Sequence, residues 1–166
     1  MIASTVRLDR TVVIHARPAT VFEFFTNPED WAAWWGTGSA IDARPGGQLL
    51  IRHPNGVEVM GEVIDLRAPE RIVFTYGYAS GGPIPPGGSQ VTIRLDSHPA
   101  GTLVQLTHEF TDAEQRDHHV QGWRFQLSLF ANAVANKVNV TAANTVVDRW
   151  FAAWSDPQTA SREATA

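Results

Sequence analysis

The sequence predicts an α+β domain in which a curved antiparallel sheet of six to seven strands wraps around one long C-terminal helix, with two short helices after the first strand. Short runs of alternating apolar residues follow one another between Gly, Pro and Asn turn signals. The links between these runs are too short for crossover helices, which favours antiparallel pairing. One long amphipathic stripe follows the last run, and a helix of that length can cover one face of the sheet.

The first strand is expected at Val6 to His15, because apolar residues there share one parity. Pro18 suits the first turn of a short helix, and Asn27 can cap a second helix in which Pro28 needs no donor. That second helix carries Trp31, Trp34 and Trp35 at helical spacing. Gly36 is expected to end it.

Five further strands are expected after the two short helices. They are Gln48 to His53, Val57 to Leu66, Arg71 to Tyr78, Gln90 to Asp96 and Thr102 to Phe110. Asn55 and Gly56 form a strong hairpin signal between the first two. The Gly- and Pro-rich segment Ser80 to Ser89 is expected to be a hairpin loop or a lid.

The long helix is expected to start with a capping box in which Thr111 caps and Glu114 reaches back. It should run to about Asn136–Val138. Its buried stripe is Val120, Trp123, Leu127, Phe130, Val134 and Val138. We therefore expect a domain over residues 1–139, an additional amphipathic helix within 140–155, and a disordered tail over 156–166.

The additional helix, Asn144 to Trp154, carries apolar residues at steps of three and four. They are Val147, Trp150, Phe151 and Trp154. A face this apolar is not expected to be left in water. It is expected to pack on its own domain or on a second subunit, so a homodimer is an open alternative.

Composition excludes several classes of protein. The formal net charge of −4 over 166 residues argues against a nucleic-acid partner, because such partners select a basic face. The absence of cysteine excludes disulfides and thiolate metal sites. No basic start followed by an apolar stretch indicates a signal peptide, and no apolar run is long enough for a membrane span. A cytoplasmic protein is the default expectation.

The chain resembles the START-like, or SRPBCC, helix-grip superfamily (a START/Bet v-like fold), and within it the branch named after the activator of the Hsp90 ATPase. The resemblance rests on the order and spacing of short sequence motifs over roughly residues 7–138. They are Arg17 to Phe22, Trp31 to Trp35, Pro45 to Gly47, Gly61 to Val63, Pro69 to Thr75, Gly101 to Leu103 and Gly122-Trp123. It implies a cavity between sheet and helix. The superfamily includes lipid carriers, hormone receptors, polyketide cyclases and co-chaperones, so a chaperone partner is also open.

Strand parity predicts the lining of that cavity. His108 shares a face with Val104, Leu106 and Phe110, and helical spacing brings the long helix over the same layer. The predicted ligand-binding residues are Trp34, Trp35, His53, Phe74, Tyr76, His108, Phe110, Trp123 and Leu127. The alternative interpretation, to which we give more weight for His53 and His108, is that they are satisfied core or sheet-edge histidines. Likewise, clustered tryptophans such as Trp31, Trp34 and Trp35 more often pack in the core than control access to a cavity.

Catalytic, metal and cofactor sites are not predicted. His118 and His119 are adjacent and point in different directions on a helix, and no His-Glu-x-x-His spacing occurs. The chain has no Gly-x-Ser-x-Gly elbow. Glu62 shares the parity of apolar residues, but we expect it to be solvated or paired, because a buried carboxylate is costly.

Three functions remain open. The leading interpretation is non-catalytic binding of a small apolar or aromatic molecule in the cavity. The second is a co-chaperone or regulator that acts through its surface. The third is a polyketide cyclase- or lyase-like enzyme that uses His108, His53 or Tyr76 as acid or base. A perturbed histidine within hydrogen-bond reach of a tyrosine or carboxylate would favour the third.

Overall fold

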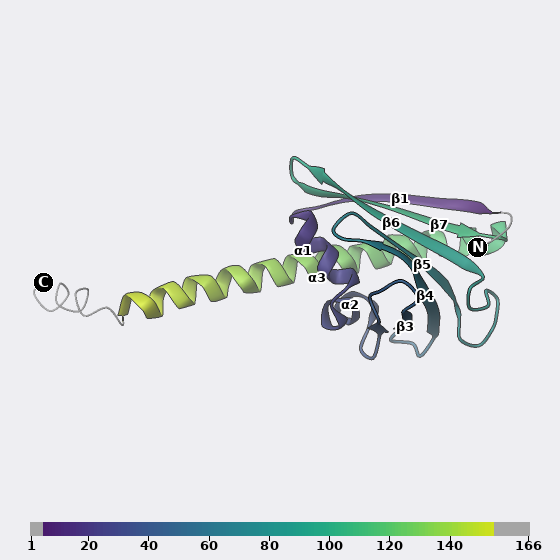
Figure 1. Ribbon diagram of the computed structural model, residues 1–166, viewed down its shortest axis with the longest axis horizontal. Coiled ribbons are helices and arrows are strands. Elements are labelled where there is room, and N and C mark those ends of the chain that lie inside the picture. The colour runs from purple at the N-terminus through teal and green to yellow at the C-terminus, as the bar shows by residue number, and fades with distance from the viewer. Residues whose placement is uncertain (1–4, 155–166) are drawn as a thin grey trace, which may run out of the picture. The chain divides into compact units, whose positions relative to one another are not determined.

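The computed structural model describes the backbone of residues 5–154 and the side chains of residues 5–150. The elements in chain order are β1 (Val6–Ile14), α1 (Pro18–Phe22), the 3-10 helix η1 (Glu23–Phe25), α2 (Pro28–Trp35), β2 (Ala40–Ile41), β3 (Gln48–Arg52), β4 (Glu58–Arg67), β5 (Arg71–Tyr78), β6 (Ser89–His98), β7 (Gly101–Phe110) and α3 (Ala113–Trp154) (Figure 1). The chain divides into two compact units, residues 1–134 and 135–166, and the division falls inside α3.

The seven strands form one antiparallel sheet in the order β1-β7-β6-β5-β4-β3-β2. Figure 1 shows this curved sheet lying over the N-terminal part of α3. The predicted α+β fold, with a long C-terminal helix and two short helices after the first strand, is confirmed. β2 was not predicted, because two residues are too few to show an alternating pattern.

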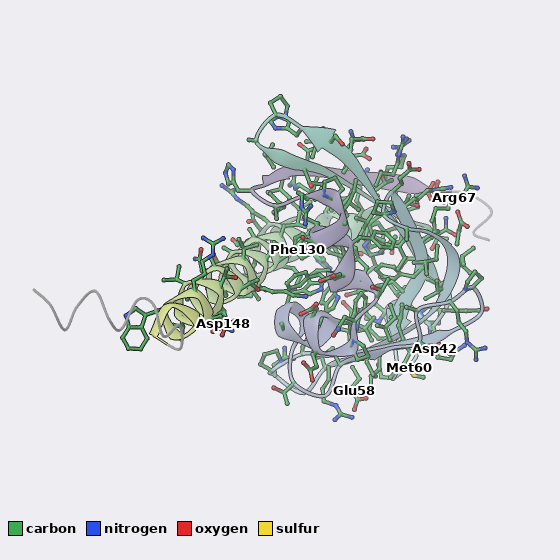
Figure 2. All side chains as sticks on the ribbon, turned by 60° about the vertical axis from the view of Figure 1, so that its left-hand side comes forward. Asp42, Glu58, Met60, Arg67, Phe130 and Asp148 are labelled. Atoms are coloured by element: carbon green, nitrogen blue, oxygen red, sulfur yellow. The ribbon has the colours of Figure 1, made fainter. Side chains whose placement is uncertain are left out.

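The core of the first unit lies between the sheet and α3. Every second residue of β7 from Thr102 to Phe110 is buried, as the alternation predicts. The α3 residues that join this core are Trp123, Leu127, Phe130 and Val134. Figure 2 shows Phe130 directed into the interior, where its ring stacks on Phe25 at a centroid distance of 5.4 Å.

The three α2 tryptophans are buried in this core and are packed against one another. Asn27 caps α2 as predicted, because its side chain accepts hydrogen bonds from the backbone N–H groups of Glu29 and Asp30. The indole N–H of Trp34 donates to the Phe24 carbonyl at 3.0 Å. The α2 helix is therefore fixed both at its start and through its buried face.

β4 contains a register shift between Val63 and Asp65. On the N-terminal side of the shift, Val59 and Val63 are buried, while Met60 and Glu62 are exposed. Figure 2 shows Met60 at the outer face. Glu62 is thus solvated, as we expect of a carboxylate that lacks a buried partner.

The start and end of α3 differ from the prediction. Asp112, and not Thr111, caps the helix, because its carboxylate accepts a hydrogen bond from the Glu114 backbone N–H at 2.8 Å. The helix does not end near Asn136–Val138 with a separate helix from Asn144, but continues as one element to Trp154. No Gly or Pro occurs between Val134 and Trp154, so nothing in this stretch interrupts the backbone hydrogen bonds.

The second unit is described through the later turns of α3. Val140, Val146, Val147 and Trp150 are exposed there. The side chains of Phe151 and Trp154, which complete the predicted apolar face, lie outside the described residues. Burial of that face against a domain or second subunit therefore stays a prediction. No helix in the described range 5–154 has the length and apolar character that a bilayer span requires.

Candidate ligand-binding site

A pocket of about 660 Å³ opens in the first unit between β5, the turn that joins β3 to β4, and the first turns of α3. Its aromatic walls are Trp35, Tyr76, Tyr78, Trp123 and Phe125. Its polar side chains are His53, Asn55, Gln115, His118, His119 and Gln126. The volume lies within the range of pockets that enclose drug-sized ligands.

The described walls of the pocket contain no carboxylate, ammonium or guanidinium group. Among the described residues that line it, none is Asp, Glu, Lys or Arg. The ionisable groups are three histidines and two tyrosines, and burial lowers the pKa of His53 and of His119. The rings of His53 and His119 are therefore uncharged at neutral pH.

The predicted binding residues divide into two groups. Four of them line this pocket: Trp35, His53, Tyr76 and Trp123. The other five are buried in the core and do not line it: Trp34, Phe74, His108, Phe110 and Leu127. The pocket thus lies at one end of the layer between sheet and helix, and only part of the predicted wall faces it.

His108 lies beneath the pocket and has hydrogen bonds at both ring nitrogens. The Trp123 indole N–H donates to His108 Nδ1 at 2.9 Å, and His108 Nε2 lies 2.8 Å from Ser89 Oγ. An indole nitrogen can only donate, so Nδ1 carries no proton and Nε2–H donates to Ser89. Ser89 Oγ donates onward to the Tyr76 carbonyl at 2.6 Å. His108 is fully buried, and burial lowers its pKa well below the usual range. This is the geometry of a satisfied core histidine.

A second hydrogen-bonded chain faces the pocket. His119 Nδ1 lies 2.7 Å from the Gln115 carbonyl, one turn earlier in α3, so Nδ1 carries the proton and donates. Nε2 is then an acceptor in the neutral ring, and Tyr78 Oη lies 3.2 Å from it and donates. Aromatic contacts hold the ring in place, with centroids 5.0 Å from Phe110 and 5.8 Å from Tyr76.

Tyr76 packs beside this chain from the core side, with its ring edge-on to Tyr78 at a centroid distance of 6.2 Å. Burial is the largest cause that raises the pKa of Tyr76, and the neighbouring Tyr78 raises it further. Burial also raises the pKa of Tyr78. Both phenols are therefore protonated at neutral pH.

The Trp35 indole N–H is buried without a hydrogen-bond partner among the described residues. The Trp35 ring packs edge-on against Trp123 at a centroid distance of 5.6 Å and against His53 at 6.0 Å. The nitrogen is covered by neighbouring atoms, so Trp35 presents an apolar surface to the pocket.

Sequence reasoning missed Gln115 and Phe125 as pocket residues, and it considered His119 only as a metal ligand. Tyr78 shares the strand parity of Phe74 and Tyr76 but was not named among the binding residues. A usable signal was present, because Gln115, His119 and Trp123 follow one another at steps of four on one helix face. Within the described part of the chain, no group of three histidine or acidic side chains is placed to hold a metal ion.

A curved antiparallel sheet packed on a long helix, with an aromatic pocket between them, defines a protein of the helix-grip class. The family described as activator of Hsp90 ATPase homolog 1-like protein matches residues 15–135. The chain belongs to this family, as the resemblance in its sequence predicted. No curated protein shows a significant match to the chain.

Solved structures share the fold at low identity. Protein CV1439 from Chromobacterium violaceum is 26% identical, with a TM-score of 0.61 over 78% of this chain and 96% of that one. The Aha1 dimer from Colwellia psychrerythraea is 19% identical, with a TM-score of 0.65 over 78% and 96%. CalU16 from Micromonospora echinospora is 20% identical, with a TM-score of 0.62 over 89% and 86%. The chain is similar to these proteins in architecture.

Proposed function

We propose that this protein binds a small, uncharged, mostly apolar molecule in the pocket between β5 and α3, without transforming it. The observation that carries the proposal is an aromatic pocket of about 660 Å³ in which no described wall residue other than histidine is acidic or basic. Aromatic walls with a few polar groups are typical of small-molecule sites. A charged ligand would lose its hydration there without a counter-charge.

Several contacts support a preformed pocket. Trp123 is held by its bond to His108, and Tyr78 is held by its bond to His119. The Gln126 side chain donates to the Trp34 carbonyl, which ties α3 to α2 beside the pocket. Walls fixed in this way lose little conformational entropy when a ligand enters.

The test is a thermal-shift screen of fatty acids, sterols, flavonoids and aromatic polyketides, combined with native mass spectrometry of freshly purified protein. A ligand that binds only the folded state adds about 2.7 kcal/mol of stability at one hundred times its dissociation constant. The proposal predicts that apolar aromatic compounds shift the melting temperature more than fatty-acid anions do.

A variant that fills the pocket tests whether ligands bind in this pocket and not elsewhere on the protein. A Cβ added at Gly122 meets no atom within 4 Å, and Gly122 lines the pocket, so we expect the side chain of Gly122→Leu to extend into the pocket. Leucine also has a higher helix propensity than glycine by about 1 kcal/mol, so the variant should fold. It should lose ligand binding, whereas Ser128→Leu, at an exposed position of the same helix, should keep it. Binding that survives Gly122→Leu unchanged would refute the proposal.

Two other functions stay as alternatives. Family membership and the dimeric solved relative favour a surface-acting co-chaperone or regulator, with a homodimer or chaperone partner. The hydrogen bond between His119 and Tyr78 favours a cyclase- or lyase-like enzyme, since burial lowers the pKa of that histidine. A chain that carries no ligand and responds to no compound class supports the first alternative. A bound compound whose mass changes during incubation supports the second.

A further inference from the structure

The chain of hydrogen bonds in the pocket has a fixed direction. The chain starts at the backbone carbonyl of Gln115. This oxygen can only accept a hydrogen bond, so the proton of neutral His119 is on Nδ1. His119 Nε2 then offers a lone pair, and that lone pair takes the hydroxyl proton of Tyr78. Tyr78 cannot turn its proton toward the pocket without leaving His119 Nε2 unsatisfied.

The hydrogen bond to His119 uses the proton of Tyr78 and leaves its acceptor capacity. A phenol oxygen has one proton and two lone pairs, and the Tyr78 proton is directed to His119 Nε2. Lone pairs therefore remain on a side chain that lines the pocket. Tyr78 presents an acceptor and no donor to whatever occupies the space.

The other polar groups of the pocket do not impose a direction. His53 can take either tautomer, and the Gln115 amide offers both a donor and an acceptor. The Gln126 amide donates one N–H to the Trp34 carbonyl and keeps its second N–H and its oxygen, so it also offers both. Asn55 and His118 are exposed at the mouth, where water competes for them. The covered indole N–H of Trp35 is not presented to the pocket. Discrimination between ligand polar groups thus depends on Tyr78.

We propose that Tyr78, oriented by His119, selects ligands that carry a neutral hydrogen-bond donor, such as a phenolic hydroxyl on an aromatic body, over their ethers and their anions. This inference rests on the proposed binding function and names its ligand class. An ether oxygen would face the Tyr78 lone pair with no proton between them. A carboxylate would face the same lone pair and would find no cation among the described wall residues.

The test uses three probes with the same apolar body: 4-phenylphenol, 4-methoxybiphenyl and biphenyl-4-carboxylate. Their dissociation constants are measured at pH 7.5 by calorimetry or by ligand-observed NMR. One net hydrogen bond corresponds to roughly threefold to tenfold in affinity. The phenol is expected to bind more tightly than the methoxy probe by that factor, and the carboxylate is expected to bind most weakly.

The decisive variant is His119→Leu, which frees the Tyr78 proton and keeps an apolar side chain against Phe110. Tyr78 can then donate to an ether oxygen, so the ratio between phenol and methoxy probe should fall to about one or reverse. His118→Leu is the matched control, because its ring makes no bond to Tyr78, and it should keep the ratio of the parent protein. Circular dichroism confirms that both variants fold.

The outcomes separate this inference from the proposed function. Equal binding of the phenol and the methoxy probe, or an unchanged ratio in His119→Leu, overturns the selection by Tyr78. If Gly122→Leu still blocks those probes, the pocket remains a binding site and only the ligand class is wrong. If no probe binds, or if the probes bind Gly122→Leu as tightly as the parent protein, both the inference and the proposed function are wrong.

Discussion

A buried histidine with hydrogen bonds at both ring nitrogens has a single protonation state open to it. His108 accepts from Trp123 and donates to Ser89, so protonation would break the indole bond as well as place a charge in the core. His108 therefore positions Trp123 under the pocket and has no nitrogen left for a ligand.

Substitution of His108 should reveal that structural role. His108→Leu leaves the Trp123 indole N–H and one side of Ser89 unsatisfied, so the free energy of unfolding should fall by about 1–3 kcal/mol. Urea denaturation at pH 7.5 measures this. The double variant His108→Leu with Trp123→Phe removes the orphaned donor and should cost less than the sum of the two single changes. Additive costs would mean that the two side chains are not coupled.

Strand parity placed His108 on the inner face of β7, and the structure agrees. Strand parity predicts which face of the sheet a side chain lies on, but not where along the layer between sheet and helix it lies. It therefore could not distinguish a residue of the closed core from a residue of the pocket wall. Tyr78 has the same strand parity as Tyr76, yet its partner His119 comes from α3, 41 residues later. A contact of that separation depends on how the helix lies on the sheet, which periodicity does not contain.

At the scale of elements, the start of α3 shows the same limit. Thr111 and Asp112 are both good capping residues one position apart, and the pattern of a capping box favoured the first. The structure uses Asp112, whose carboxylate meets the Glu114 N–H at the positive end of the helix. Which of these two adjacent residues caps α3 depends on the conformation of the turn that follows β7.

The cap assignment gives a paired prediction. Asp112→Ala removes the carboxylate that satisfies a helix N–H, and it should lower the free energy of unfolding by about 0.5–2 kcal/mol. Thr111→Ala, one residue earlier, should change it by less than about 0.5 kcal/mol. Thermal and urea unfolding of both variants measure the difference. A larger loss at Thr111 than at Asp112 would restore the capping box that the sequence suggested.

Long, strongly patterned elements were predictable, whereas short and irregular ones were not. β4, β5 and β7 were each expected within one residue of their observed bounds, because their alternation is long and their turns are marked. The register shift after Val63 and the two-residue strand β2 are defined by pairing with neighbouring strands, which the pattern of a single segment does not show. The continuation of α3 was missed because exposed β-branched residues weaken the helical pattern without breaking the helix.

At the scale of the whole molecule, stability is linked to pH through buried histidines. Burial lowers the pKa of His53, His108 and His119 below the value of 6.5 that a free side chain has. His108 and His119 also have neutral forms fixed by hydrogen bonds. The folded protein therefore binds fewer protons than the unfolded chain at mildly acidic pH.

The sign of the effect follows from linkage. When the folded pKa lies below the unfolded one, the stabilising contribution is complete above the unfolded pKa near 6.5 and is lost as pH falls from there toward the folded value. For His108 the slope is at most about 1.4 kcal/mol per pH unit. Asp9, whose pKa is lowered chiefly by its hydrogen bond from Thr107, titrates in a more acidic window below 3.8.

The free energy of unfolding should therefore be constant between pH 8 and 7 and should decrease between pH 6.5 and 5, where carboxylates contribute little. Urea titrations at half-unit intervals measure the profile. His108→Leu, although less stable at every pH, should show a shallower decrease, because it removes the most deeply buried of the three titrating rings. Ser128→Leu, which changes an exposed residue of α3 that carries no titrating group, should keep the slope of the parent chain. A decrease that is equally steep in His108→Leu would show that the acid sensitivity comes from groups outside the layer between sheet and helix.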